Sequence, residues 1–233
     1  MDKKYTYEEF LEIIARLRGD GGCPWDREQT HESLRSCLLE ESYELVDAIN
    51  HKDIANIREE LGDVLLQVVM HAQIAKENNE FSMEDVVQDI ASKMVYRHPH
   101  VFGQQKDVHT SDDVLVNWEK LKQKEKNEQT PYEAMERVAK ALPALTRSQK
   151  VYKKANKAGL VEIDKKDVFA QIKQRLESLE NSLSNEENGE IDMEIGNLLL
   201  DIVKLSTFFD INAEFALTKS MEKFINRFRY IEN

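Results

Sequence analysis

Acidic side chains are paired at helical spacing in two neighbouring segments, and they carry the strongest chemical signal in the chain. Glu41 and Glu44 are three residues apart within LLEESYELV, and Glu60 and Asp63 repeat this spacing within REELGD. Residues three apart lie on the same face of a helix. Carboxylate oxygens are the ligands that Mg²⁺ and Mn²⁺ prefer in proteins. The spacing therefore indicates a site for a divalent cation of this kind.

A short connection, His51–Asp53, joins the two helices that carry these acids, which predicts an antiparallel hairpin. Glu41 and Asp63 each lie about 11 residues from its midpoint. Glu44 and Glu60 each lie about 8 residues from it. With a rise of ~1.5 Å per residue and helix axes ~8–10 Å apart, the four carboxylates reach matching heights and can share an ion. The alternative interpretation is an ordinary acidic helix face in contact with water.

Two cations and one aromatic residue suit a phosphate-bearing ligand. Lys93 and Arg97 are four residues apart near the end of a predicted helix. They could grip phosphate oxygens held by a metal ion, or they could simply complement the negative end of the helix dipole. Trp25 follows the glycine-rich loop GDGGCP. Its ring could stack on a base or fill a gap in the core.

The elements that must position these residues are predicted to be helices throughout, because helix-breaking residues are scarce. The chain has 8 glycines and 4 prolines among 233 residues, and strand-like alternation is weak. We expect an all-α fold, with Asp53 and Ser82 as helix N-caps. The predicted helices cover about 6–18, 30–49, 54–76, 82–96, 134–142, 146–157, 166–183, 191–209 and 214–230; 19–25 is predicted as a loop, 120–129 as a solvated helix end or linker, and 185–189 as a turn.

The two halves of the chain resemble each other, but the second half has lost its acids. ELGDVLL at 60–66 matches EIGNLLL at 194–200, an offset of 134 residues, and the apolar frame is retained. At this offset Gln174, Arg175, Ser178 and Asn197 replace Glu40, Glu41, Glu44 and Asp63, and only Glu60 keeps its charge, as Glu194. We expect an active domain at 1–128, a linker at 129–145 and a degenerate domain at 146–233, structural or regulatory, that cannot bind Mg²⁺.

Composition excludes several classes of function. The formal net charge is −12, so bulk charge does not favour binding to a nucleic-acid polymer or to an anionic membrane. Two cysteines, Cys23 and Cys37, make neither a disulfide framework nor a zinc motif. No apolar stretch is long enough to span a bilayer, and the N-terminus lacks the apolar segment of a secretory signal. We therefore expect a cytoplasmic protein.

Four collinear segments resemble the MazG family of nucleoside triphosphate pyrophosphohydrolases. They are CPWDREQTHESL at 23–34, LLEESYELVDAI at 38–49, REELGDVLLQVV at 58–69 and RHPHVFG at 97–103. The family signature, Glu-Glu-x-x-Glu followed by Glu-x-x-Asp, is met by Glu40, Glu41, Glu44, Glu60 and Asp63. The resemblance covers nearly the whole chain, in the tandem two-domain form of the family.

This resemblance implies a fold, a reaction and a set of site residues. The fold would be all-α and would form a homodimer with four-helix-bundle-like cores. The reaction would be Mg²⁺-dependent hydrolysis of (deoxy)nucleoside triphosphates to monophosphate and pyrophosphate, which cleans the nucleotide pool. By the motif match, Glu41, Glu44, Glu60 and Asp63 would be metal ligands, Glu40 would assist them or activate water, Lys93 and Arg97 would hold phosphates, and Trp25 would contact the base.

Two features of this family prediction leave alternatives open. Mn²⁺ could replace Mg²⁺ at an all-oxygen site. Some tandem members of the family are thought to rely on the C-terminal site, whereas here only the N-terminal acids are complete. The rival hypothesis is a non-catalytic helical scaffold that senses nucleotides or binds another protein.

Overall fold

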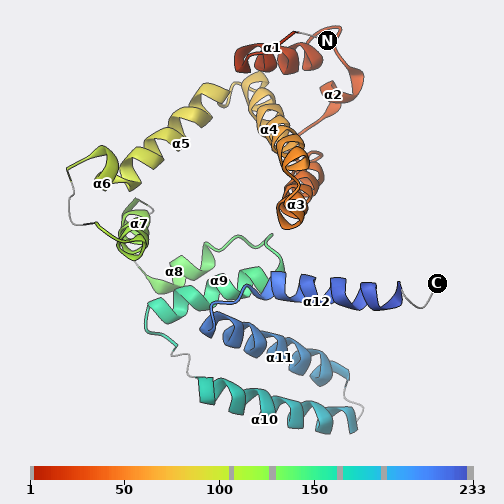
Figure 1. Cartoon of the computed structure of the whole chain (residues 1–233), viewed down its shortest axis with the longest axis vertical. Coiled ribbons are helices and arrows are strands. Elements are labelled where there is room, and N and C mark those ends of the chain that lie inside the picture. Colours follow the sequence, from red (N-terminus) through yellow and green to blue (C-terminus); the bar gives the residue numbers. More distant parts are fainter. Residues whose placement is uncertain (1–2, 105–107, 126–129, 162–164, 185–187, 230–233) are drawn as a thin grey trace. The chain divides into compact units, whose positions relative to one another are not determined.

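The computed structural model describes residues 3–104, 108–125, 130–161, 165–184 and 188–229, which contain helices and no strand (Figure 1). The all-α prediction is confirmed. Chain contacts divide the protein into two compact units, Met1–Leu121 and Lys122–Asn233. The helices are α1 (Tyr7–Arg18), α2 (Pro24–Glu28), α3 (Arg35–His51), α4 (Ile54–Glu77), α5 (Met83–Arg97), α6 (Pro99–Phe102), α7 (Ser111–Glu125), α8 (Pro131–Glu136), α9 (Ala144–Lys157), α10 (Lys165–Ser184), α11 (Asn188–Phe208) and α12 (Ala213–Phe228).

The hairpin formed by α3 and α4 is closed by a tight connection. Lys52 ends α3 in the left-handed conformation, with φ of 57°. Asp53 then caps α4, and its carboxylate accepts hydrogen bonds from the backbone N–H groups of Ala55 and Asn56. The predicted N-cap at Asp53 is thus confirmed. The connection forces α3 and α4 to run antiparallel and side by side (Figure 1).

Helix α1 anchors the far end of this hairpin. Ile14 of α1 packs with Leu34, Val69 and Ile74 in the core of the first unit. Arg18 is also buried there. Its guanidinium forms a bidentate ion pair with the carboxylate of Glu77 and donates hydrogen bonds to the backbone carbonyls of Asp26 and Gln29. This side chain therefore fixes α1, α2 and the end of α4 to one another.

The second predicted N-cap, Ser82, is also confirmed. Its hydroxyl accepts from the backbone N–H of Asp85, and the carboxylate of Asp85 accepts from the backbone N–H of Ser82. This reciprocal pair starts α5 at Met83. Helix α5 packs against α4 near this corner and then diverges from the α3–α4 hairpin (Figure 1).

Several predicted boundaries are wrong, for local reasons. Helix α3 begins at Arg35 instead of near residue 30, because Thr30 and Ser33 bond to each other's backbone N–H and hold a turn. Residues 134–142 are not one helix. Helix α8 starts earlier, at Pro131 directly after the N-cap Thr130, and it ends at Glu136 with Arg137 as its C-cap.

Other segments contain helices that the sequence prediction missed or misplaced. The predicted loop 19–25 ends in the short α2, and α6 and most of α7 were not predicted. The solvated run 120–129 is helical up to Glu125, and 126–129 lie outside the described residues. The predicted turn at 185–189 is wrong at its end, because α11 already begins at Asn188; 185–187 are also outside the described residues.

The second unit contains α8 to α12. Helix α11 packs against α9, α10 and α12, and α8 packs on α9. Gln149 of α9 is buried and binds the turn before α12: its amide donates to the carbonyl of Ile211 and accepts from the N–H of Ala213. Helix α8 lies within 129–145, the segment predicted as a linker. None of the described helices in either unit has the length and apolar character needed to cross a membrane.

Candidate metal centre on the first hairpin

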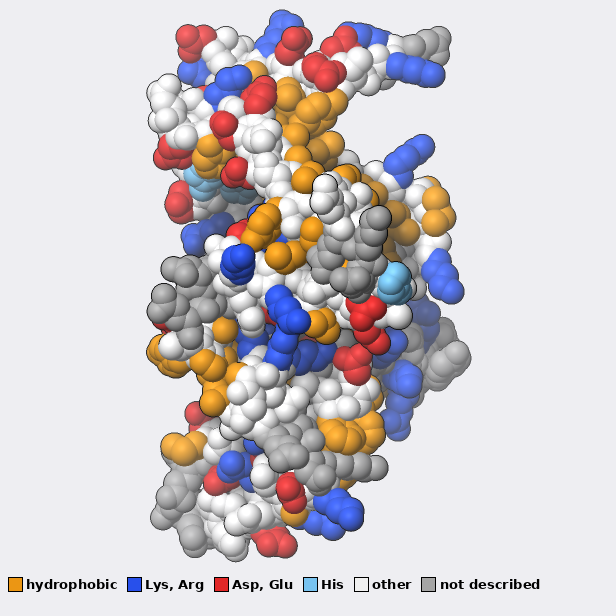
Figure 2. All heavy atoms as spheres, turned by 90° about the vertical axis from the view of Figure 1, so that its left-hand side faces the viewer, with side chains coloured by type: hydrophobic (Ala, Val, Ile, Leu, Met, Phe, Trp, Pro, Cys, Tyr) orange, Lys and Arg blue, Asp and Glu red, His pale blue; other side chains and the backbone are white. Residues whose placement is uncertain are grey.

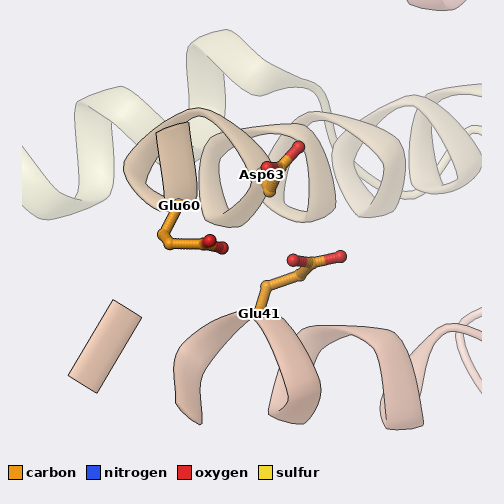
Figure 3. Close-up of side chains that lie close together, drawn as sticks. All are labelled: Glu41, Glu60 and Asp63. Carbon is orange, nitrogen blue, oxygen red and sulfur yellow. The ribbon is translucent and has the colours of Figure 1, made fainter. Parts of the chain in front are cut away.

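Three of the predicted metal ligands meet between α3 and α4. Glu41 extends from α3, and Glu60 and Asp63 extend from α4, one helical turn apart (Figure 3). A carboxylate oxygen from each lies within 4.8 Å of the other two. The carboxylates of Glu41 and Glu60 reach into the space between the two helices (Figure 3). The hairpin geometry expected from the chain thus gathers these three acids.

Burial makes this cluster electrostatically strained. Glu60 is only 8% exposed, and its Oε2 atom is buried without a hydrogen-bond partner. Burial raises the pKa of Glu60, and the nearby charges of Glu44, Asp63 and Glu41 raise it further. Burial likewise raises the pKa of Glu41, followed by repulsion from Asp63 and Glu44. Unpaired buried carboxylates are costly, and a bound cation would relieve both repulsion and desolvation.

The donor set also fits a particular class of ion. All three side chains offer oxygen, with no nitrogen or sulfur ligand in the group. Hard divalent cations such as Mg²⁺ accept such ligands and keep coordinating waters in the remaining positions. The unpartnered Oε2 of Glu60 supplies a ligand atom that the rest of the described chain leaves unused. The residues present could therefore hold a divalent metal ion.

The remaining two predicted acids lie at the border of this cluster. Glu44 is exposed and is outside the group of three, although its charge raises the pKa of both Glu41 and Glu60. Glu40 is exposed as well, and its charge acts on Glu41. Their roles as ligand and water-activating group remain predictions. Both are close enough to influence the field at the cluster.

A polar stripe continues along α4 beyond the acids, and sequence reasoning missed it. Gln67 is 6% exposed, and its Oε1 is buried without a partner. One turn further, His71 contacts His31 through their Nδ1 atoms at 2.7 Å, with the rings stacked. Burial lowers the pKa of His71, and the neighbouring His31 lowers it further. The spacing of Gln67 and His71 from Asp63, four and eight residues, was the signal that could have identified them.

The predicted phosphate-binding cations are not beside the acids within one chain. Lys93 and Arg97 lie at the end of α5, which Figure 1 shows diverging from the α3–α4 hairpin. Arg97 is 7% exposed, and its guanidinium stacks 5.2 Å from the ring centre of Trp118 on α7. His98 packs edge-on against the same ring. Trp118 was not identified from the sequence.

Trp25 also lies apart from the core. It belongs to α2, which packs against α1, and it is 58% exposed. The core-filling alternative is therefore wrong for this residue. Its ring is open to a ligand, and its predicted contact with a base remains a prediction.

Comparisons with known proteins point to one family. A sequence profile of the MazG nucleotide pyrophosphohydrolase domain matches residues 29–102, which contain α3, α4 and α5. The chain is 39% identical over 226 residues to the nucleoside triphosphate pyrophosphohydrolase/pyrophosphatase MazG of Thermotoga maritima, covering 97% of this chain and 85% of that protein.

Two further relatives extend over almost all of the sequence. The nucleoside triphosphate pyrophosphohydrolase of Escherichia coli K12 is 36% identical, covering 97% of this chain and 86% of its own length. The uncharacterized protein YabN of Bacillus subtilis is 43% identical, covering 99% of this chain and 48% of its own length. Because the similarity runs through both units and includes the hairpin with the acid cluster, the chain belongs to the MazG nucleotide pyrophosphohydrolase family.

Proposed function

We propose that this protein hydrolyses (deoxy)nucleoside triphosphates to the monophosphate and pyrophosphate, with Mg²⁺ at the first hairpin. The observation that carries the proposal is the convergence of Glu41, Glu60 and Asp63 within 4.8 Å around an unpartnered carboxylate oxygen. The nucleoside triphosphate pyrophosphohydrolase names of the Thermotoga and Escherichia relatives support the reaction class. Clearing unwanted nucleotides from the cytoplasmic pool is the biological role that we predict for it.

We assign metal binding, proton transfer, phosphate binding and base stacking to different residues of the site. Glu41, Glu60 and Asp63 would hold the ion, and Glu44, at the border of the cluster, would be the fourth carboxylate ligand. Bound Mg²⁺ supplies charge neutralisation at phosphate oxygens and lowers the pKa of water. We assign Glu40 to accept the proton of the water that attacks the α-phosphorus, while the bond to the bridging oxygen breaks and pyrophosphate leaves. Lys93 and Arg97 offset the phosphate charge, and Trp25 stacks on the base.

A homodimer would bring the separated groups together. The first hairpin exposes large apolar side chains, including Leu39, Tyr43, Leu61 and Leu65. On the face drawn in Figure 2, hydrophobic side chains reach the surface in several separate patches. Such surfaces are typical of interfaces, and two hairpins packed face to face make a four-helix bundle. We propose that Lys93 and Arg97 of one copy bind the phosphates of a substrate held at the carboxylate cluster of the other copy.

The second unit has similar unpaired apolar surface. Helix α12 exposes a series of apolar residues that a pairing helix would cover: Phe215, Leu217, Met221, Phe224, Ile225 and Phe228. A dimer that uses both units would therefore be held at two places. Light scattering of the purified chain measures this oligomeric state directly.

The test of the reaction is pyrophosphate and monophosphate release from a mixture of nucleoside triphosphates, in Mg²⁺ and in EDTA. We expect release in Mg²⁺, weaker or altered release in Mn²⁺, and none in EDTA. A folded dimer that binds nucleotide without releasing pyrophosphate would replace this proposal with the scaffold hypothesis. Pyrophosphate release that persists in EDTA would show that the reaction does not need a metal ion.

A further inference from the structure

The second hairpin, α10–α11, repeats the first but carries a different charge pattern. At the offset of 134 residues, Arg175 stands at the position of Glu41, Ser178 at that of Glu44, and Glu194 at that of Glu60. Asp201 stands at the position of Gln67. The cation Arg175 therefore occupies the position where the first hairpin offers an anion.

The side chains of this second hairpin satisfy one another. Arg175 Nε donates to Asp201 Oδ2 at 2.7 Å, and its Nη1 donates to Glu194 Oε2 at 3.4 Å. Ser178 Oγ donates to the other oxygen of Glu194 at 3.1 Å. Lys204 Nζ donates to the other oxygen of Asp201 at 2.8 Å. All four carboxylate oxygens of the two acids are thus bound by groups of the same chain.

Burial shows why this arrangement matters for folding. Asp201 is 1% exposed, which makes it one of the most completely buried side chains described. A buried carboxylate is tolerated only with strong partners. The hydrogen bond to Asp201 raises the pKa of Arg175, so the guanidinium stays charged. Two cations and two anions leave this cluster neutral.

The contrast with the first hairpin is direct. There, Glu60 has a buried oxygen without a partner, and the nearby acids raise its pKa. Here, its counterpart Glu194 has both oxygens hydrogen-bonded. An added cation would stabilise the first hairpin, whereas the second already contains two cationic side chains of its own, Arg175 and Lys204.

We propose that Arg175 takes, in the second hairpin, the place that a divalent cation takes in the first, so that the C-terminal unit stays folded without metal. This inference rests on the proposed metal site in the first hairpin. It assigns the C-terminal unit a metal-independent structural role within the full chain. It also explains how the acids of this half could be lost while its helical frame remained.

Hydrogen exchange of the full-length chain, followed by mass spectrometry in Mg²⁺ and in EDTA, tests both hairpins at once. We expect Mg²⁺ to slow exchange in α3 and α4 and to leave α10 and α11 unchanged. Slower exchange of α10 and α11 in Mg²⁺ would overturn the inference. If α3 and α4 do not respond, the proposed metal site fails instead, so the two failures are distinguishable.

Substitution of the guanidinium gives the second test. Arg175→Gln should speed exchange in α10 and α11 about tenfold or more, in Mg²⁺ and EDTA alike, because Asp201 and Glu194 lose their shared partner. Arg175→Lys should restore part of the protection. The matched control is Lys173→Gln, which removes one exposed positive charge from the same helix. Equal exchange in the Arg175→Gln and Lys173→Gln variants would show that Arg175 has no such role.

Discussion

Glu41 of α3 and Glu60 of α4 direct their carboxylates toward each other across the hairpin, within 4.8 Å, although both are acids. Burial is the first cause that raises the pKa of each, and repulsion from Asp63 and Glu44 adds to it for both. A folded chain keeps such a pair only at a cost in stability. A bound cation, as we propose, would remove this cost.

The variant Glu60→Gln should lose activity by about 10²-fold or more, because a ligand oxygen becomes an amide with little affinity for Mg²⁺. The chain should stay folded, because a buried repulsive charge is removed. Pyrophosphate release and the melting temperature in EDTA measure the two effects. Glu59→Gln, which changes the exposed neighbouring acid, is the matched control. Retained activity in Glu60→Gln would exclude this residue from metal binding.

A mixing experiment tests whether two copies share one site. Glu60→Gln and Lys93→Ala should each be weakly active alone. After subunit exchange at equal amounts, about half of the dimers should contain one copy of each variant. Each mixed dimer has two sites, and one of them combines an unchanged Glu60 from one copy with an unchanged Lys93 from the other. About one quarter of all sites should therefore be active. Activity of the mixture is compared with that of each unmixed variant. An absence of recovery, with exchange verified by mass spectrometry, would place Lys93 in its own chain's site or in none.

The ion pair between Arg18 and Glu77 should make stability depend on pH. Hydrogen bonds from Arg18 lower the pKa of Glu77 below its usual 4.5, so the pair contributes stability above that value and loses it as the pH falls through the lowered pKa. Glu77→Gln should therefore cost about 1–2 kcal/mol near pH 7, with allowance for the partial exposure of Glu77. Urea unfolding from pH 7 to pH 3 should show the difference from wild type shrinking. Glu80→Gln, an exposed acid just beyond α4, should show no such trend.

Trp25 should contribute to substrate binding without contributing to stability. Its ring is mostly exposed, so Trp25→Ala should leave the melting temperature almost unchanged. Base stacking is worth about 1–3 kcal/mol, so KM should rise about 5-fold to 160-fold, with kcat less affected. Trp25→Phe should retain part of the affinity. An unchanged KM for all four common nucleotides would remove Trp25 from the base site.

Local features of the first unit were predictable because they depend on neighbouring residues. Asp53 and Ser82 cap the helices that begin just after them, and the short connection around Lys52 fixes antiparallel helices with a known rise. The caps and the short connection are enough to predict that Glu41 of α3 and Asp63 of α4 lie at the same height along the hairpin.

Long-range features were not predictable in the same way. Whether Glu44 joins the cluster or stays exposed depends on how far each helix is rotated about its axis, which packing decides. The guanidinium of Arg97 stacks on the ring of Trp118 and so joins α5 to α7, a helix that was mostly not predicted. The direction of α5 depends on its contact with α4. Sequence spacing describes one helix at a time and cannot supply these relations.

The left-handed residue Lys52 sets a strict limit on variation in an exposed turn. Each residue added to a helix rotates the next residues about the helix axis by about 100°. An insertion between His51 and Asp53 that extended either helix would turn Glu60 and Asp63 away from Glu41 by about 100° for each residue added. Natural variants of this protein should therefore tolerate changes of side chain in this turn far better than changes in its length.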